Sequence, residues 1–350
     1  MNNRSLLLYF ASGLSTSSRH SQLEEGRTTQ ESIHVASAFR RHRPKTGDSD
    51  SVEVVRSVIW RMLKLKLELI KSSKTGLLVV LVVLAWGWLF VAPGSCRFVV
   101  RGASRGIGLE FTRQLLQNKG NGHVISTCRN PQAATGLLHL KDQYADRLHI
   151  LPLDLTHETT IQESAEFVKD RFGSLNLLVN ASCILSIPNV MQPETTLNKV
   201  EKSSLLLAYE VNAVGPILVI KHMWPLLKAG GGSATDTDLA VAANLSARVG
   251  SIGDNRLGGW HSYRASKAAL NQLTKTVAVE FARKKDPIIC LLLHPGTVDT
   301  DLSKPFQKNV PEGKLFTKEF SVQQLLKIIN NAKRHDNGKF FAWDGTEIPW

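Results

Sequence analysis

The chain has 350 residues, of which 43% are hydrophobic and 21% are charged, so it is long enough to bury a large core. This composition excludes a collagen-like chain, a coiled coil and a wholly disordered chain. The net charge is +13, but no basic stripe is interleaved with aromatic residues, so we expect no nucleic-acid partner. The four cysteines are scattered without metal-ligand spacing, which argues against a disulfide framework or a zinc site.

Residues 1–96 differ in character from the rest of the chain, because they hold 13 basic and only 7 acidic residues. The first 22 residues contain several serines and threonines and no acid. Two interpretations stay open for them, a presequence for a mitochondrion or plastid and a disordered terminus. Residues 1–75 as a whole are predicted to be a basic targeting or disordered extension.

Residues 76–92 form an uncharged run of 17 residues, GLLVVLVVLAWGWLFVA. This is the lower limit for a helix that spans a membrane. The run has no polar face and carries two tryptophans towards its carboxyl end, as interfacial aromatics often lie. The pattern favours a single transmembrane helix over a buried segment. We therefore expect the protein in a membrane, or in an organelle through its extension.

From residue 97 onward, short apolar runs alternate with longer stretches of helical period. Runs that are apolar on both faces and separated by helices predict a parallel sheet covered on both sides. The region 97–350 is therefore predicted to be one α/β domain with a doubly wound, seven-stranded parallel sheet, a Rossmann fold. The predicted strands are 97–101, 123–128, 148–153, 175–180, 239–245, 288–294 and 340–343. The predicted helices are 106–119, 158–171, 204–228, 261–284 and 321–334, with a flexible loop at 229–237.

Three glycines, Gly102, Gly106 and Gly108, lie directly after the first predicted strand and open the first helix. Gly102 permits a tight turn, Gly106 lets the backbone approach a pyrophosphate, and Gly108 lets the helix pack close to the strand. The free amides and the dipole at the start of the helix then bind phosphate. We therefore predict a dinucleotide site, whose loop also includes Ser104, Arg105 and Ile107.

The end of the second strand bears on the choice of dinucleotide. An acid there would bind the ribose hydroxyls of NAD, but the chain reads TCRN at 127–130. Arg129 and the loop residue Arg105 are placed to pair with a 2′-phosphate, so NADP(H) is favoured; the alternative for each arginine is a surface charge. Asp154, after the third strand, either contacts the adenine amino group or caps a helix.

Tyr263 and Lys267 are four residues apart in a predicted helix and share one face. An ammonium beside a phenol favours the phenolate, so Tyr263 is a candidate for proton exchange near neutral pH. A YxxxK pattern alone usually marks two surface residues, but this one follows a glycine-rich strand–helix unit and precedes a Pro-Gly turn. Trp260 and His261 are predicted either to line a substrate cleft or to pack at its rim.

These motifs follow the order found in the short-chain dehydrogenase/reductase family, and residues 97–350 resemble that family. The stretches NLSARVGSIGDN, YRASKAALN and HPGTVDTDL resemble its C-factor-like subgroup of plants and bacteria. The resemblance implies an NADPH-dependent oxidoreductase that reduces a small or medium carbonyl compound or oxidises the alcohol. It also implies a homo-oligomer, either a dimer or a tetramer.

The resemblance further implies a role for each matched residue. Tyr263 is the general acid, Lys267 lowers its pKa and binds the ribose, and Asn212 holds a helix kink and a water. Ser246 polarises the carbonyl group. The implied cofactor contacts are Gly102, Ser104, Arg105, Gly106, Ile107, Gly108, Arg129, Asp154, Leu155, Asn180, Lys267, Pro295, Gly296 and Thr297.

Three positions depart from the family pattern. The family's serine aligns nearest Ala247, so Ser246 is assigned from one residue earlier. Cys183 replaces a glycine where the backbone passes close to the cofactor, and Arg101 stands where a small polar residue is usual; its burial is costly unless it is paired. These departures support an alternative, a nucleotide-binding protein without turnover that serves interaction or signalling, whereas the intact Asn212, Tyr263 and Lys267 argue against it. A second alternative is an epimerase or dehydratase on the same fold.

Overall fold

The computed structural model of the chain describes residues 96–118, 120–232 and 239–350. The predictions for residues 1–75 and 76–92 lie outside the described residues, as does most of the loop predicted at 229–237. The seven strands of the main sheet match the seven predicted runs closely. They are β1 (Arg97–Arg101), β2 (His123–Cys128), β3 (Leu148–Pro152), β4 (Leu177–Asn180), β5 (Ala240–Leu245), β6 (Ile288–His294) and β9 (Lys339–Ala342).

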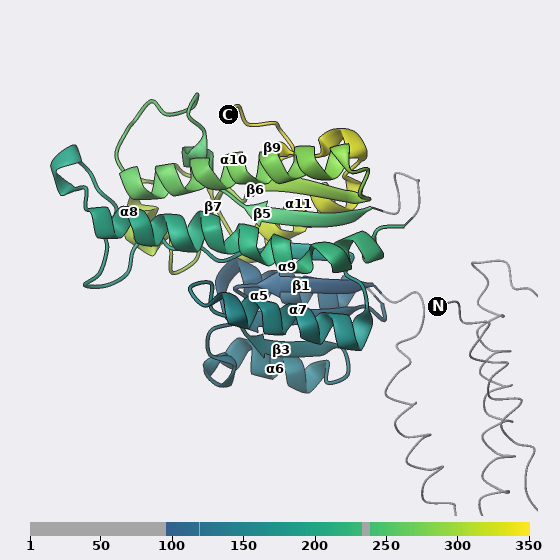
Figure 1. Ribbon diagram of the computed structural model, residues 1–350. Coiled ribbons are helices and arrows are strands. Elements are labelled where there is room, and N and C mark those ends of the chain that lie inside the picture. Colours follow the sequence, from purple (N-terminus) through teal and green to yellow (C-terminus); the bar gives the residue numbers. More distant parts are fainter. Residues whose placement is uncertain (1–95, 119, 233–238) are drawn as a thin grey trace, which may run out of the picture. The chain divides into compact units, whose positions relative to one another are not determined.

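The sheet is doubly wound and confirms the predicted Rossmann fold. The strand order is β3-β2-β1-β4-β5-β6-β9, and every neighbouring pair is parallel. The chain builds outward from β1 in one direction and, from β4 onward, in the other (Figure 1). In such sheets, ligands bind at the carboxyl ends of the strands beside this reversal. The fold therefore directs attention to the residues that follow β1 and β4.

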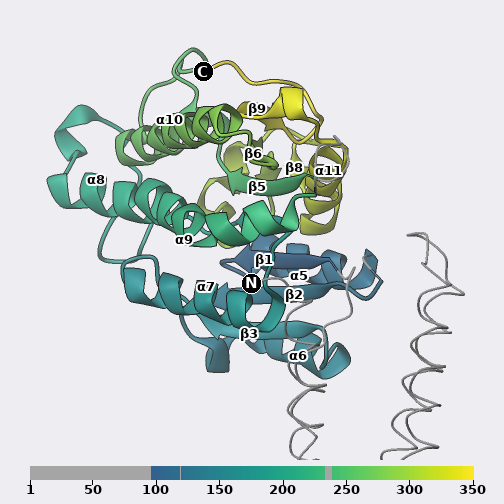
Figure 2. The ribbon, with the colours of Figure 1, turned by 45° about the vertical axis from the view of Figure 1, so that its right-hand side comes forward.

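Helices cover both faces of the sheet, as Figures 1 and 2 show. One apolar core lies between the sheet and α5 (Gly106–Asn118), α6 (Thr135–Gln143) and α11 (Lys318–Asn331). The other lies between the sheet and α7 (Glu158–Phe172), α9 (Gly215–Gly230) and α10 (His261–Arg283). Since both faces are buried, the strands read as continuous apolar runs rather than alternating ones. This is why the sequence predicted their positions well.

A long apolar helical stretch, Lys202–Gly230, is built from α8 (Lys202–Tyr209), a π-helical turn (Glu210–Val214) and α9. By length and composition alone, this stretch in the described part of the chain would suffice to cross a membrane. Its buried side chains, however, belong to the core of this domain; they include Val219, Ile220, Met223 and Leu227. These contacts make the stretch part of the domain core. The sequence did not predict α6 or the small sheet of β7 (Thr297–Val298) and β8 (Leu315–Phe316).

Candidate active site

The glycine-rich loop after β1 has a backbone that only glycine accommodates. Gly102 has φ 78°, and the N–H groups of Gly102 and Ala103 both donate to the carbonyl of Thr127 at 3.0 Å. A β-carbon at Gly108 would collide with the carbonyl of Gly102. The loop is thus tied to the end of β2 and delivers the start of α5, whose first turn carries no acid. These residues fit a phosphate group held by helix amides.

Arginines flank the glycine-rich loop where the sequence predicted a 2′-phosphate contact. Arg105 and Arg129 are both exposed. Arg105 Nη1 lies 3.5 Å from Asp301 Oδ2 in an ion pair that is largely solvated, and such pairs are weak and easily exchanged for another anion. Ser104 and Ile107 are half-buried in the same loop.

Asp154 follows β3 and forms a local turn. Its Oδ1 accepts hydrogen bonds from the backbone N–H of Thr156 at 3.0 Å and from the Thr156 hydroxyl at 2.8 Å. Partial burial opposes ionisation, but these two bonds prevail and lower the pKa of Asp154. Leu155 is buried beside Gly215. The cap position of α7 is His157, so the alternative that Asp154 caps this helix is wrong, because its carboxylate is used in the turn with Thr156. Its adenine contact stays a prediction.

Tyr263 and Lys267 are both buried on α10, with 6% and 1% of their surface exposed. Lys267 Nζ donates to the carbonyl of Leu245 at 2.8 Å and lies 5.7 Å from the centre of the Tyr263 ring. Burial lowers the pKa of Lys267 and raises the pKa of Tyr263 well above its ordinary value, with a further increase from Cys183. The sequence predicted that Lys267 lowers the pKa of Tyr263. In the structure the pKa of Tyr263 is instead raised, by burial first and by Cys183 second, so Tyr263 keeps its proton.

Asn212 lies in the π-helical turn and ties the loop after β4 to α10. Its Oδ1 accepts from the N–H of Ile184 at 2.8 Å, and its Nδ2 donates to the carbonyl of Ile184 at 2.8 Å and to Ser266 Oγ at 3.0 Å. Isolated π turns recur at functional sites. The structure therefore places Asn212 between the loop that carries Cys183 and the helix that carries Tyr263.

Ser246 is buried at the end of β5, and its hydroxyl is already engaged. Ser246 Oγ donates to Asn271 Oδ1 at 2.6 Å, and a hydroxyl has only one proton to give. Cys183, by contrast, is half-buried, and its Sγ lies 3.9 Å from the hydroxyl of Tyr263. The thiol therefore lies against the candidate proton donor, while Ser246 must leave Asn271 before it can polarise a carbonyl group.

Arg101 is buried at the end of β1, as its position in the sequence suggested, and it is paired. Its Nε donates to Asn180 Oδ1 at 3.0 Å and its Nη2 to the carbonyl of Ser182 at 2.9 Å. Asn180 Nδ2 donates in turn to Asn244 Oδ1 at 2.7 Å, and Asn244 Nδ2 to Thr274 Oγ1 at 2.8 Å. Burial lowers the pKa of Arg101 to about 10. The side-chain amide of Asn180 is thus used within this network, and its cofactor contact stays a prediction.

The turn after β6 lies at the carboxyl edge of the sheet, as the other candidate site residues do. Gly296 has φ 79°, Thr297 begins the small sheet by pairing with Leu315, and the carbonyl of Pro295 accepts from the Ser321 hydroxyl at 2.8 Å. The structure thus places the turn next to α11.

The ring of Trp260 lies between those of Tyr263 and Phe306 in a chain of aromatic contacts. The ring of Trp260 lies 6.2 Å from that of Tyr263 and 4.9 Å from that of Phe306. Trp260 and His261 are half-buried. Their role at a substrate cleft, as wall or as rim, stays a prediction.

Comparison with known proteins decides the family. A model of the short chain dehydrogenase family matches residues 97–311, more than half of the chain. The chain belongs to the short-chain dehydrogenase/reductase family. An uncharacterized oxidoreductase of Schizosaccharomyces pombe is 32% identical over 265 residues, which are 72% of this chain and 97% of that protein. The C-signal of Myxococcus xanthus is 32% identical over 154 residues, covering 44% of this chain and 83% of that protein.

Solved structures of family members resemble the chain as well. The NADPH-bound carbonyl reductase from chicken fatty liver has a TM-score of 0.66 and 31% identity, covering 73% of this chain and 99% of that one. The carbonyl reductase Sniffer of D. melanogaster has a TM-score of 0.64 and 28% identity, with coverage of 73% and 99%. The family and fold predicted from the sequence are confirmed.

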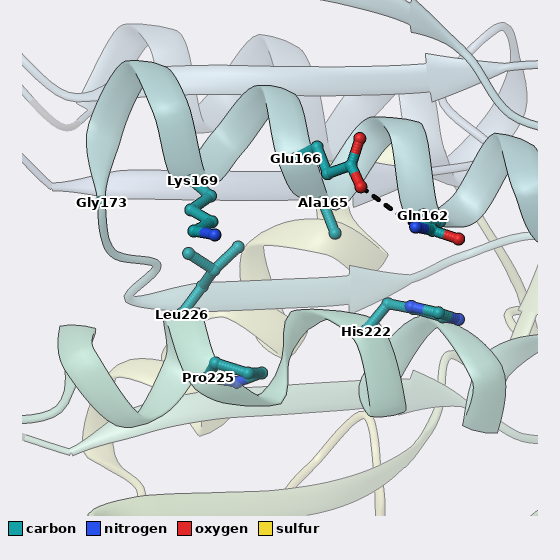
Figure 3. A pocket seen from close by; sticks show the side chains of 8 residues that line it. All are labelled: Gln162, Ala165, Glu166, Lys169, Gly173, His222, Pro225 and Leu226. Carbon is teal, nitrogen blue, oxygen red and sulfur yellow. Dashed lines mark hydrogen bonds between the residues drawn. The ribbon is translucent and has the colours of Figure 1, made fainter.

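A groove of about 480 Å³ lies elsewhere on this family member, between α7 and α9 (Figure 3). Gln162 donates to Glu166 along one wall at 3.0 Å, and none of the predicted site residues lines the groove. The complete lining is Gln162, Ala165, Glu166, Lys169, Gly173, His222, Pro225 and Leu226. The groove is therefore separate from the candidate active site.

The sequence did not predict the contacts of two contributors to the site. Asn271 holds the Ser246 hydroxyl, and Glu194 contacts the residue that precedes Tyr263. Asn271 ends the stretch YRASKAALN, but nothing in that stretch indicates its bond to Ser246, and Glu194 belongs to no recognisable motif. Each acts through a partner distant along the chain. An observed contact in the folded chain was needed to find them.

Proposed function

We propose that the chain is an NADPH-dependent carbonyl reductase that acts on a small or medium carbonyl compound, or oxidises the corresponding alcohol. The observation that supports this most is the buried hydroxyl of Tyr263 beside Lys267, at the sheet edge that also bears the glycine loop. The similarity to carbonyl reductases, one of them NADPH-bound, supports the same activity.

NADPH, when bound, supplies the hydride that reduces the carbonyl carbon. Tyr263 donates its hydroxyl proton to the carbonyl oxygen, and its raised pKa holds that proton until the oxygen becomes basic. The ammonium of Lys267, fixed by the Leu245 carbonyl, then stabilises the tyrosinate until solvent returns a proton. Asn212 keeps the Cys183 loop and α10 in register.

The preference for NADPH over NADH is part of the proposal. The exposed Arg105 and Arg129 and the absence of an acid at 127–130 support it. We expect Arg129→Ala to weaken NADPH binding by about 1–3 kcal/mol, the range for charge-assisted hydrogen bonds, and to leave NADH binding nearly unchanged. Titration of both cofactors by nicotinamide fluorescence measures this, with the exposed Arg283→Ala as control. Equal wild-type affinities for the two cofactors would contradict the preference.

The decisive experiment is NADPH oxidation by the chain with a panel of aldehydes and ketones, comparing wild type with Tyr263→Phe. Removal of the proton donor should slow turnover about 100- to 10,000-fold. NADPH binding should survive, because the ring and its packing remain. Tyr209→Phe, at an exposed tyrosine of α8, is the matched control. Full activity in Tyr263→Phe would remove the proposed mechanism.

A second candidate function is NADP binding without turnover. The observation that favours it is the position of Cys183 Sγ, 3.9 Å from the Tyr263 hydroxyl, where a carbonyl oxygen would have to approach. The hydrogen bond from the Ser246 hydroxyl to Asn271 also favours this candidate, because it leaves Ser246 no proton for a carbonyl oxygen. A wild-type chain that binds NADPH and turns over no compound of the panel would support this candidate.

The proposal also includes a membrane anchor and self-association. The uncharged run 76–92 supports a single-span anchor. Leu206 and Tyr209 on α8 and Val279 on α10 are exposed apolar side chains, which support a homo-oligomer.

A further inference from the structure

The loop between β4 and α8 reaches back to the start of α10 through Glu194, a residue that no motif marks. Glu194 is 3% exposed. Its Oε2 accepts the backbone N–H of Ser262 at 3.2 Å, and its Oε1 accepts the Ser262 hydroxyl. Its own main-chain carbonyl accepts the N–H of Trp260 at 2.6 Å. One residue thus holds two of the three positions that precede Tyr263.

A buried carboxylate needs a compensating positive charge or several hydrogen bonds. Within the part of the chain that the structure describes, Glu194 forms no ion pair with Lys, Arg or His. Its compensation is the first turn of α10, where unpaired N–H groups and the positive end of the helix dipole lie. Trp260, the cap position of this helix, provides no side-chain cap of its own. Glu194, which is distant in the sequence, therefore accepts the hydrogen bonds of the first turn of α10 that a local capping residue usually accepts.

The backbone that leads into α10 needs such support. Gly258, Gly259 and Trp260 have φ values of 65°, 66° and 52°, and the left-handed region is unfavourable for a bulky residue such as tryptophan. The bond from the Trp260 N–H to the Glu194 carbonyl holds this conformation. It also sets the Trp260 ring against Tyr263 and Phe306.

Tyr263 is the third residue of α10, so it lies in the turn where helices fray. A shift of about 1 Å in a reacting group can cost about 100-fold in rate. We propose that Glu194 is a positioning residue, whose carboxylate caps the first turn of α10 and thereby fixes the Tyr263 hydroxyl for proton donation. This inference rests on the proposed function, because it assumes that Tyr263 is the donor.

The test compares Glu194→Ala and Glu194→Gln with wild type in the full chain, and uses Glu201→Gln, at an exposed glutamate of the same loop, as control. Glutamine keeps one acceptor oxygen, so it restores one of the two bonds to Ser262. We expect kcat for carbonyl reduction to fall about 10- to 100-fold in Glu194→Ala, with the KM for NADPH unchanged. We expect Glu194→Gln to recover most of the loss and the control to match wild type.

Hydrogen exchange of the backbone amides provides a measurement that does not depend on activity. Peptides covering 259–266 should exchange faster in Glu194→Ala, and less so in Glu194→Gln. If Glu194→Ala does not fold, Ser262→Ala removes the hydroxyl bond alone and should give an intermediate loss of kcat.

Wild-type kcat in Glu194→Ala, or a loss of kcat that Glu194→Gln does not relieve, would overturn the positioning role and leave the proposed function standing. A wild-type chain without turnover would overturn the proposed function. In that case hydrogen exchange alone tests whether Glu194 caps α10. Unchanged exchange of residues 259–266 in Glu194→Ala would refute the cap, and faster exchange would support it.

Discussion

At the carboxyl ends of β1 and β5, called the carboxyl edge below, the buried cations Arg101 and Lys267 each bond to oxygens. At the amino ends of β2 and β3, called the amino edge below, two half-buried histidines lie among aromatic rings. Arg101 and Lys267 at the carboxyl edge bond to oxygens of Asn180, Ser182 and Leu245. At the amino edge, His123 and His149 lie 3.4 Å apart between their ring nitrogens. Burial lowers the pKa of both histidines, that of His149 to about 4.

The cost of desolvating ionisable groups is offset in different ways at the two edges. One arrangement serves the proposed reaction, and the other affects stability. The carboxyl edge keeps its cations by giving each an oxygen partner, as desolvated charges require. The amino edge instead keeps its imidazoles neutral and packs them against Phe167 and Phe172, with ring centres 5.2–5.9 Å apart. Substitutions should therefore affect turnover at the first edge and the pH dependence of folding at the second.

The largest effect is expected from Lys267→Ala at the carboxyl edge. Turnover should fall at least about 100-fold, because the tyrosinate loses its cation, and NADPH binding should weaken because the ribose loses a donor. Tyr263→Phe should leave binding intact, so the pair of variants separates the two roles. Steady-state kinetics and cofactor titration measure both quantities, with the exposed Lys202→Ala as control. Unchanged NADPH affinity in Lys267→Ala would mean that Lys267 acts only on the phenol of Tyr263 and does not bind the ribose.

A smaller effect is expected where the polar network supports the site without touching it. Asn244→Ala removes two buried hydrogen bonds that link Asn180 to Thr274. Asn180 Nδ2 then retains only its 3.4 Å bond to the carbonyl of Pro216, and Thr274 Oγ1 its bond to the carbonyl of Leu270. The free energy of unfolding should fall by about 1–3 kcal/mol. Urea denaturation measures it, with Asn331→Ala at an exposed position of α11 as control. If the free energy of unfolding fell by no more than in the control, the network would not stabilise the fold. The contrast between the edges would then weaken.

The fold could be predicted from the sequence because the sheet is buried on both faces. Seven apolar runs marked its strands, and the ends of β1, β2 and β6 agree to the residue with the predicted bounds. The helix α6 was missed because it has nine residues and buries only Leu137 and Leu140. The strands β7 and β8 were missed because two residues cannot show a period.

The site was predictable where the chemistry is local and not where it depends on contacts between distant segments. Gly102 and the spacing of Tyr263 and Lys267 could be recognised because one turn or one helix face defines them. The sequence could not show that Asn271 occupies the hydroxyl of Ser246 or that Glu194 caps α10. Nor could it show the sign of the shift at Tyr263, because burial is a property of the folded chain.

The smallest effect is expected at the amino edge, from His149→Phe. The folded-state pKa of His149 is about 4, below the value of about 6.5 for an unfolded chain. Above pH 6.5 both states are neutral and its contribution to stability is complete. As the pH falls towards 4, His149 binds a proton in the unfolded chain but stays neutral in the folded chain, so the free energy of unfolding decreases. Phenylalanine suits the aromatic cluster and takes up no proton.

We therefore expect His149→Phe to match wild type near pH 7 and to be more stable by about 1–2 kcal/mol near pH 4.5, allowing for the partial exposure of this histidine. Urea denaturation across that pH range measures the difference. His139→Phe, at an exposed histidine of α6, is the control and should follow the wild-type curve. The kinetic constants of His149→Phe near pH 7 should equal those of wild type, because the amino edge does not touch the reaction. If the variant instead lost stability in parallel with wild type, the histidines would not be the groups that make this edge sensitive to acid.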